Sequence, residues 1–162
     1  MNNKYPNGHK KQYLTPEGKE KLEVELQELK NNGRKSIAER LKSAISMGDL
    51  SENADYHKAK EDQAFLEGRI QEIEAILYNS EVIETQSNYN KVVVGAKVTI
   101  KEADFPRETY HLVGSQEANP REGKISHESP IGKALIGHQV GDSVTAVLPN
   151  GEAIELEILA IE

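Results

Sequence analysis

Three carboxylates spaced three residues apart, Asp49, Glu52 and Asp55, are the side chains of this sequence best placed to do chemistry. They lie in residues 47–56, between two long segments of helical periodicity, so one helix must turn back on the next there. Gly48 supplies the backbone freedom that a tight reversal needs. The positive end of the helix dipole favours acids in the first turn of the returning helix, which accounts for Glu52 and Asp55 but not for Asp49.

Two or three carboxylates without other ligands resemble an incomplete Mg²⁺ site, because Mg²⁺ prefers oxygen ligands and keeps several waters. The end of an isolated hairpin offers no substrate pocket, so we expect no catalysis by this chain alone. An acidic tip on a long arm makes more chemical sense if it enters the active site of another protein and completes the metal coordination there. No Walker loop, nucleophile elbow or Cys/His metal spacing is present, and the five histidines are scattered.

The first half of the chain predicts an antiparallel helical hairpin over residues 13–84. Thr15 and Pro16 form a helix start, with Thr as the N-cap and Pro at the first helical position. Apolar residues then recur at steps of three and four on both sides of the turn, and a short reversal makes the two arms pack on one another. The expected seam comprises Leu22, Leu26, Leu29, Gly33, Ile37 and Leu41 on the first arm and Ala59, Gln63, Leu66, Ile70, Ile73 and Leu77 on the second.

Basic residues gather on the first arm, where Lys30, Arg34, Lys35, Arg40 and Lys42 fall within thirteen residues. One interpretation is an ordinary solvated helix face. The other is a surface that steers nucleic-acid phosphates along the hairpin. No aromatic residues interleave with these cations, so base stacking is not indicated.

The second half, residues 85–162, predicts a small antiparallel β-sheet with one short helix, and the whole chain is therefore an α+β protein. A helix start at Ser129-Pro130 opens the predicted helix 129–136. Asn150-Gly151 is a hairpin signal between the last two strands. The predicted strands are 92–94, 97–100, 110–113, 143–148 and 153–161.

Charge and composition exclude several classes of protein. The formal charge of −7 argues against a general DNA-coating protein, and most of the excess acid lies in residues 79–162. The absence of cysteine excludes a disulfide scaffold, and no apolar run is long enough to cross a bilayer. Residues 1–12 are polar, lack the core of a signal peptide and are expected to be a disordered extension. We expect a cytoplasmic monomer with no membrane contact, because the hairpin satisfies its own seam.

Three segments carry a resemblance to a known family. Residues 47–57 (MGDLSENADYH) resemble the tip motif of the GreA/GreB family of bacterial transcript-cleavage factors, and most closely its GreA branch. Residues 13–18 (YLTPEG) resemble the opening of that family, and residues 129–137 (SPIGKALIG) with 140–142 (VGD) resemble its C-terminal signature. The resemblance runs from about Tyr13 to the C-terminus, whereas residues 1–12 extend beyond the usual start.

The resemblance implies a coiled-coil hairpin followed by an FKBP-like domain, and it implies a mode of action. The C-terminal domain docks on RNA polymerase and the hairpin enters the secondary channel. There Asp49 and Glu52 help to hold the second Mg²⁺ and the attacking water, and the polymerase cleaves its backtracked RNA. The factor is then not an enzyme and has no tightly bound cofactor of its own. Asn53, Asp55 and Tyr56 match the surrounding motif and would support the tip.

Two further sets of residues follow from the resemblance. The basic patch facing the displaced RNA 3′ end would comprise Arg34, Lys35, Arg40 and Lys42. The polymerase-docking segment would comprise Ser129, Pro130, Ile131, Lys133 and Leu135.

Three rival functions remain. An anti-cleavage paralogue would occupy the same channel and inhibit, although such paralogues alter the tip and residues 49–53 are intact here. A coiled-coil adaptor would use the tip only to contact a basic partner. An independent Mg²⁺ nuclease would cleave RNA without polymerase.

Overall fold

The computed structural model describes residues 12–48, 53–84 and 89–162. The chain forms two compact units. The first contains Glu20–Asn79, and the second combines residues 12–19 with Ser80–Glu162. The ends of the segment expected to form the hairpin, residues 13–19 and 80–84, therefore group with the β-rich unit. Of the expected N-terminal extension, residues 1–11 lie outside the described residues.

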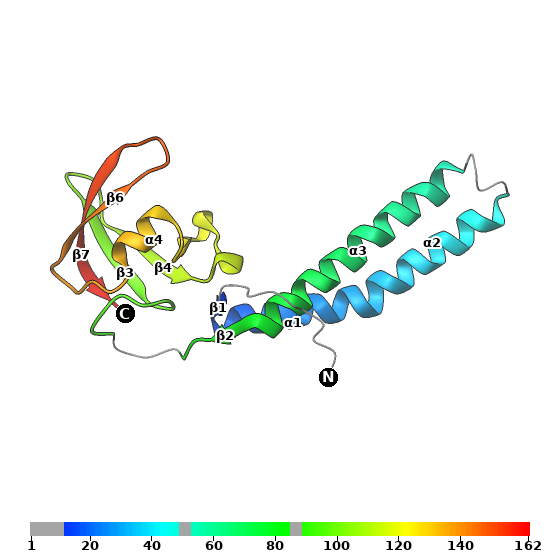
Figure 1. The fold of residues 1–162 in the computed structure, drawn as a ribbon, viewed down its shortest axis with the longest axis horizontal. Helices are drawn as coiled ribbons and strands as arrows, with labels where there is room; N and C mark the ends of the chain where they lie inside the picture. Colours follow the sequence, from blue (N-terminus) through cyan, green and yellow to red (C-terminus); the bar gives the residue numbers. More distant parts are fainter. Residues whose placement is uncertain (1–11, 49–52, 85–88) are drawn as a thin grey trace. The chain divides into compact units, whose positions relative to one another are not determined.

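A helical hairpin makes up the first unit, and its first helix begins four residues before that unit, at Pro16. Its first arm comprises α1 (Pro16–Glu28), a π-helical turn η1 (Leu29–Gly33) and α2 (Arg34–Ser46), and its second arm is α3 (Ala54–Asn79). The helices α2 and α3 run side by side in opposite directions (Figure 1). This confirms the predicted hairpin.

Apolar side chains from the predicted seam join the two arms. Leu26, Ile70 and Ile73 are buried, and Leu22, Leu29, Leu66 and Leu77 pack against them. Toward the turn the buried residues become small, because Ala44 and Ala59 replace the larger side chains. Small residues let the two backbones approach each other closely.

The π-helical turn in the first arm was not predicted. The Arg34 N–H donates to the Leu29 carbonyl, which inserts one residue into the helical repeat without leaving the helical region of backbone conformation. Gly33 closes this turn, and a Cβ there would lie 2.8 Å from a Leu66 methyl group. The glycine of the predicted seam thus makes room for a leucine of the facing arm.

The second unit contains two sheets. The strands β1 (Gln12–Leu14) and β2 (Ser80–Val82) form a parallel pair. The larger sheet has the order β5-β4-β3-β7-β6, with β3 (Lys97–Glu102), β4 (Glu108–Val113), β5 (Lys124–Ser126), β6 (Ser143–Val147) and β7 (Ala153–Ile161). Two short 3₁₀ turns, η2 (Ser115–Glu117) and η3 (Pro120–Glu122), connect β4 to β5.

One face of the larger sheet is covered by the helix α4 (Pro130–Leu135). Alternate residues of the strands point into the core beneath it, among them Val98, Leu112, Leu156 and Ile158, each with no more than 1% of its surface exposed. The β6–β7 hairpin turns at Asn150-Gly151 as predicted, and the Leu148 N–H donates to the Glu152 carbonyl at 2.8 Å. The predicted sheet with one short helix is confirmed.

Two details of the sheet differ from expectation. Residues 92–94 form no strand, because Val92 bonds instead with the loop after α4: its N–H donates to the His138 carbonyl and its carbonyl accepts from the Gly137 N–H, each at 2.8 Å. The strand β5 was missed, and it pairs in parallel with β4, so the sheet is not wholly antiparallel. Of the expected polar linker, residues 85–88 lie outside the described residues.

Within residues 12–48, 53–84 and 89–162, no helix is both long and apolar enough to span a membrane.

Candidate functional site at the hairpin turn

The structure describes the two ends of the turn that the sequence singled out. On one side α2 ends at Ser46, with Met47 as its C-cap, and Gly48 follows at a φ of 119°. On the other side α3 begins at Ala54. The two principal candidate acids, Asp49 and Glu52, lie outside the described residues.

Asn53 connects both ends of the turn. Its carbonyl accepts from the His57 N–H at 3.1 Å, and its side-chain oxygen accepts from the Tyr56 N–H at 3.0 Å. These bonds make Asn53 the N-cap of α3. Its side-chain nitrogen donates to the Ala44 carbonyl of α2 at 2.8 Å.

The other two residues expected to support the tip differ in exposure. Asp55 is exposed in the first turn of α3, where the helix dipole favours a carboxylate. Tyr56 is half-buried and meets the ring of His57 edge-on, with 5.7 Å between the ring centroids. No group of three or more His, Asp or Glu side chains that could hold a metal occurs among the described residues. A complete metal site is therefore not built into the described part of this chain.

The basic residues of the first arm fall into two classes. Arg34 pairs with Glu67 at 2.7 Å and Arg40 pairs with Asp62 at 2.6 Å, both across the hairpin. Lys30 likewise pairs with Glu74 at 2.7 Å.

Lys35 and Lys42 form the second class. Both are exposed, and neither makes an ion pair with any residue that the structure describes. They are seven residues apart on one helix, which places them on the same side. Of the four predicted patch residues, these two are the ones with cations available to a phosphate.

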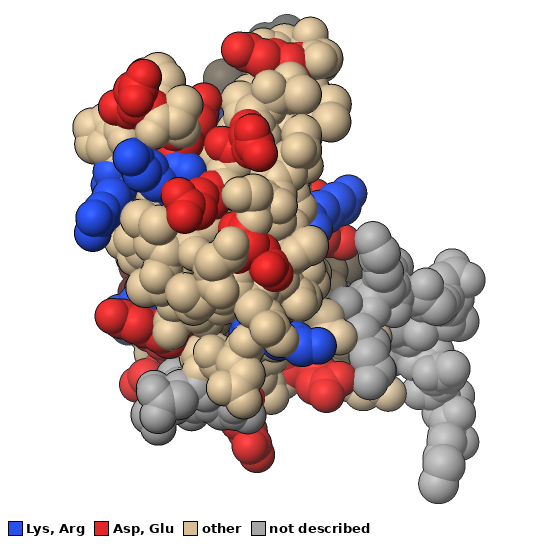
Figure 2. Space-filling model, turned by 90° about the vertical axis from the view of Figure 1, so that its left-hand side faces the viewer, with Lys and Arg blue, Asp and Glu red and all other residues tan. Residues whose placement is uncertain are grey.

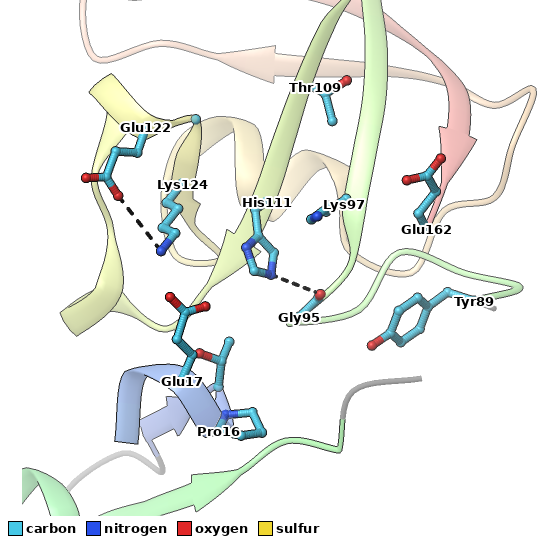
Figure 3. Close-up of a pocket in the computed structure, with 12 residues that line it drawn as sticks. Pro16, Glu17, Tyr89, Gly95, Lys97, Thr109, His111, Glu122, Lys124 and Glu162 are labelled. Atoms are coloured by element: carbon cyan, nitrogen blue, oxygen red, sulfur yellow. Dashed lines mark hydrogen bonds and ion pairs between the residues drawn. The ribbon is translucent and has the colours of Figure 1, made fainter. Parts of the chain in front are cut away.

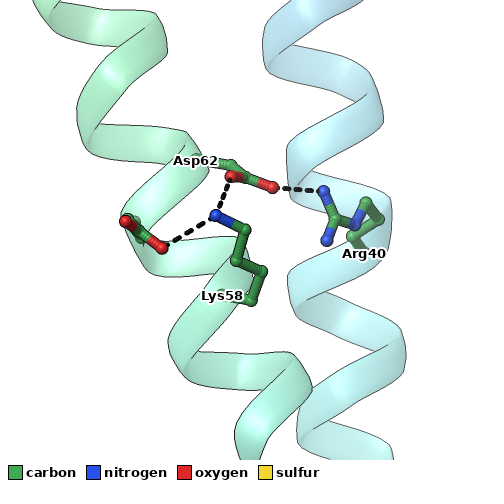
Figure 4. A network of polar contacts seen from close by, with 4 residues as sticks. Arg40, Lys58 and Asp62 are labelled. Atoms are coloured by element: carbon green, nitrogen blue, oxygen red, sulfur yellow. Dashed lines mark hydrogen bonds and ion pairs between the residues drawn. The ribbon is translucent and has the colours of Figure 1, made fainter.

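The cross-arm pairs change the acidity of their carboxylates. Figure 4 shows Asp62 between Arg40 of the facing arm and Lys58 of its own arm. Its hydrogen bond with Arg40, and then that with Lys58, lower the pKa of Asp62 below its ordinary value. The hydrogen bond with Arg34 lowers the pKa of Glu67 in the same way.

The predicted docking segment lies on and beside α4. The Ser129 side chain caps this helix by accepting from the Gly132 N–H at 3.0 Å, as the sequence predicts. Ser129, Pro130 and Ile131 are half-buried and Lys133 is exposed. Leu135 is completely buried in the core, so its side chain contributes to the fold and offers no surface to a partner.

A partly apolar cleft of about 990 Å³ lies beside α4. Lys133 and Ile136 contribute from the helix and its C-cap, and Val93 and Val94 contribute from the segment before β3. Tyr13 and His127 line it as well, and their rings meet edge-on at 5.6 Å. This concave surface could not be predicted from the sequence, because its walls come from five separate stretches of the chain.

A second cleft, of about 760 Å³, lies at the outer face of β3 and β4. Figure 3 shows Lys97, His111 and Lys124 in it, together with Glu17, Glu122 and Glu162. Burial, and then the two nearby lysines, lower the pKa of His111, although its hydrogen bond to the Gly95 carbonyl opposes this. The mixed charge selects neither an anion nor a cation, so we assign this cleft no ligand.

Sequence reasoning also missed the contact that completes the cap of α1. The Thr15 side chain accepts from the Gly18 N–H at 3.0 Å, as an N-cap does. In addition, Glu117 of η2 accepts from the Thr15 N–H at 2.7 Å and from the Thr15 hydroxyl. A partner 102 positions away leaves no signal in the local sequence.

Comparison with known proteins places both parts of the chain in one family. The family model described as "Transcription elongation factor, N-terminal" matches residues 12–82, and that described as "Transcription elongation factor, GreA/GreB, C-term" matches residues 86–162. The chain is 50% identical to transcription elongation factor GreA of Clostridium acetobutylicum over 155 residues, which cover 94% of this chain and 98% of the relative. It is 49% identical to GreA of Bacillus subtilis over 142 residues, covering 87% and 90%.

A solved structure, the GreA factor homolog 1 (Gfh1) protein of Thermus thermophilus, aligns over 94% of this chain and 99% of its own. Its identity is 29%, and its TM-score of 0.44 is too low to support an argument from shape. Family membership rests instead on the two family models and on the relatives at about 50% identity. This chain belongs to the GreA/GreB family of transcription elongation factors.

Proposed function

We propose that this protein stimulates RNA polymerase to cleave backtracked RNA, and that it acts as a cofactor without nuclease activity of its own. The observation that carries the proposal is the Asp49/Glu52 pair, which lies in sequence between the end of α2 and the start of α3, at the turn of a hairpin. Family membership supports it, because the relatives are transcription elongation factors.

The chemistry of the acids fits a shared Mg²⁺. Carboxylate oxygens are ligands that Mg²⁺ prefers, but two side chains supply too few for its octahedral shell. The described residues add no further cluster of ligands. Asp49 and Glu52 would therefore act together with ligands of the polymerase. Such a metal stabilises the charge on attacking and leaving oxygens when it is bound.

The rest of the chain would bind RNA polymerase and orient the hairpin on it. Ser129, Pro130, Ile131 and Lys133, with the cleft beside α4, form our proposed docking surface for polymerase. The acidic character of the second unit supports a protein partner over a nucleic acid there, because residues 79–162 hold 7 Lys and Arg against 13 Asp and Glu. Acidic side chains are spread over the face of this unit that Figure 2 shows.

Lys35 and Lys42 are our proposed contacts to the displaced RNA 3′ end. They replace the larger predicted patch, because Arg34 and Arg40 are engaged across the hairpin. We further propose a monomer that works where bacterial RNA polymerase does, in the cytoplasm.

The test uses a stalled, backtracked elongation complex of bacterial RNA polymerase with labelled RNA and Mg²⁺. We expect fast RNA release with the wild-type protein and polymerase together. The Asp49→Ala/Glu52→Ala variant with polymerase should give only the polymerase's own slow release, and the protein without polymerase should give none. Release without polymerase would establish a nuclease. Suppression of the polymerase's own slow cleavage would instead establish an inhibitor.

A further inference from the structure

The Asn53 amide bonds to both arms of the hairpin at once. Its oxygen accepts from the Tyr56 N–H in the first turn of α3, and its nitrogen donates to the Ala44 carbonyl in the last turn of α2. Only one orientation of the amide satisfies both bonds, since the oxygen cannot donate to a carbonyl and the nitrogen cannot accept from an N–H. The side chain is therefore a bridge as well as a cap.

Few other residues could do both. Ser, Thr and Asp cap helices well, but an ionised Asp has no donor and a hydroxyl is too short to serve two partners on different helices. Gln carries the same amide on a longer chain and is not a preferred cap. An ordinary helix start would thus accept several residue types, whereas this bridge needs Asn.

The bridge joins the two arms next to the turn, at the end of α2 and the start of α3. Ala44 and Ala59, beside it on α2 and α3, are 3% and 1% exposed. The Ala44 carbonyl also accepts from the Met47 N–H at 3.2 Å, which forms the C-cap of α2. One carbonyl therefore joins the end of α2 to the start of α3, and residues 49–52 connect those two points.

We propose that Asn53 is a positioning residue for the cleavage reaction: by fixing the end of α2 to the start of α3, its amide sets where Asp49 and Glu52 stand. This inference rests on the proposed function of those two acids. Asn53 itself need touch neither metal nor RNA. A displacement of about 1 Å in a group that acts on a reacting centre can lower a rate by about 100-fold.

The variant that separates bridging from capping is Asn53→Ser, because Ser retains the cap and loses the bond to Ala44. We expect the maximal rate of stimulated cleavage, measured at saturating factor, to fall by about 10- to 100-fold. The factor concentration at half-maximal rate should stay unchanged, and more Mg²⁺ should be needed for half-maximal cleavage. The matched control is Asn32→Ser, since the Asn32 side chain donates to Glu28 of its own arm, at 2.8 Å, and to no residue of the facing arm that the structure describes. It should behave as the wild type.

Amide hydrogen exchange gives a readout that is independent of cleavage. In Asn53→Ser we expect the Tyr56 amide to remain protected and the Met47 amide to exchange faster, because the end of α2 loses its link to α3. An unchanged maximal rate would overturn the proposal. So would loss of Tyr56 protection together with a lower rate, since Asn53 would then act only as a helix cap.

Failure of the proposed function can be told apart from failure of this inference. If the wild-type protein stimulates no RNA release, the proposed function fails, and there is no cleavage reaction in which Asn53 could act. The exchange measurement then still shows whether the amide couples the two arms. Unchanged exchange at Met47 would overturn the bridge itself.

Discussion

At the scale of single residues, the opening of α1 shows how one distant carboxylate constrains a glycine. A Cβ at Gly18 would lie 2.1 Å from the Glu117 carboxyl carbon. Glu117 could escape only by giving up its bonds to Thr15, whose side chain is 7% exposed. The glycine of the YLTPEG segment is thus explained by packing against η2.

Gly18→Ala tests this explanation. We expect it to lower the free energy of unfolding by about 0.5–2 kcal/mol, the usual range for a lost cap, as measured by chemical denaturation. Gly68→Ala is the matched control, because its Cβ position inside α3 has no heavy atom within 4 Å apart from the adjoining residues and the nearby backbone of the helix itself. That change should stabilise by about 0.5–1 kcal/mol through helix propensity. Equal stability of the Gly18→Ala variant and the wild type would show that Glu117 does not cap α1.

Leu135 gives a second prediction at this scale. Its side chain is fully buried between α4 and the sheet. Leu135→Ala should therefore cost about 2–5 kcal/mol of unfolding free energy. Lys133→Glu, on the exposed side of the same helix, should leave stability nearly unchanged and weaken polymerase binding. A Lys133→Glu variant that binds normally would remove this lysine from the docking surface.

At the scale of elements, the two arms are joined by ion pairs as well as by their apolar seam. Hydrogen bonds from arginines lower the pKa of Asp62 and Glu67 in the folded state. A lowered folded-state pKa means that the unfolded chain binds the proton more readily. These pairs thus stabilise the hairpin above about pH 4 to 4.5, and their contribution is lost as the pH falls below that range.

The corresponding measurement is thermal unfolding, followed by far-UV circular dichroism between about pH 6 and pH 3. The wild-type melting temperature should fall with acidification more steeply than that of Arg34→Gln/Arg40→Gln, which lacks the cross-arm partner of each carboxylate and leaves Asp62 only Lys58 of its own arm. Parallel pH profiles would mean that the cross-arm pairs contribute nothing to folding.

The same pairs separate structural cations from those proposed to meet RNA. We expect Lys35→Glu/Lys42→Glu to weaken cleavage of complexes with long backtracked RNA while the melting temperature stays close to that of the wild type. Arg34→Gln/Arg40→Gln is the comparison and should chiefly affect the hairpin itself. The assignment is wrong if reversing both lysine charges leaves the cleavage of long backtracked RNA unaltered.

At the scale of the whole molecule, the features that could be predicted were those with local or periodic signals. The seam follows from Leu22, Leu26, Ile70 and Ile73 at steps of three and four, and the start of α4 from Ser129-Pro130. The three-residue strands β1, β2 and β5 are too short to show a period. Val92 belongs to an apolar run that resembles a strand, but its partners are the carbonyl of His138 and the N–H of Gly137 in a distant loop.

The site likewise divides into features with a local sequence signal, which could be predicted, and contacts between distant residues, which could not. The acidic turn was evident from residue type and spacing, and Asn53 was marked by its place in the motif. The bond from Asn53 to Ala44 depends on how two helices approach, so no local pattern could reveal it. The pairing of Arg34 with Glu67 and of Arg40 with Asp62 likewise depends on the register of the two arms. Because both arginines are paired, our proposed RNA contacts are reduced to Lys35 and Lys42.

The most direct test of the central claim is the RNA release rate from a backtracked complex saturated with the Asp49→Asn/Glu52→Gln variant. These substitutions keep side-chain shape and remove both charges. If the acids help to hold Mg²⁺ at the polymerase centre, stimulated release should fall by about 100-fold or more, while the variant still displaces labelled wild-type protein from polymerase. Release at the wild-type rate would show that the hairpin acts without its carboxylates and would contradict the account.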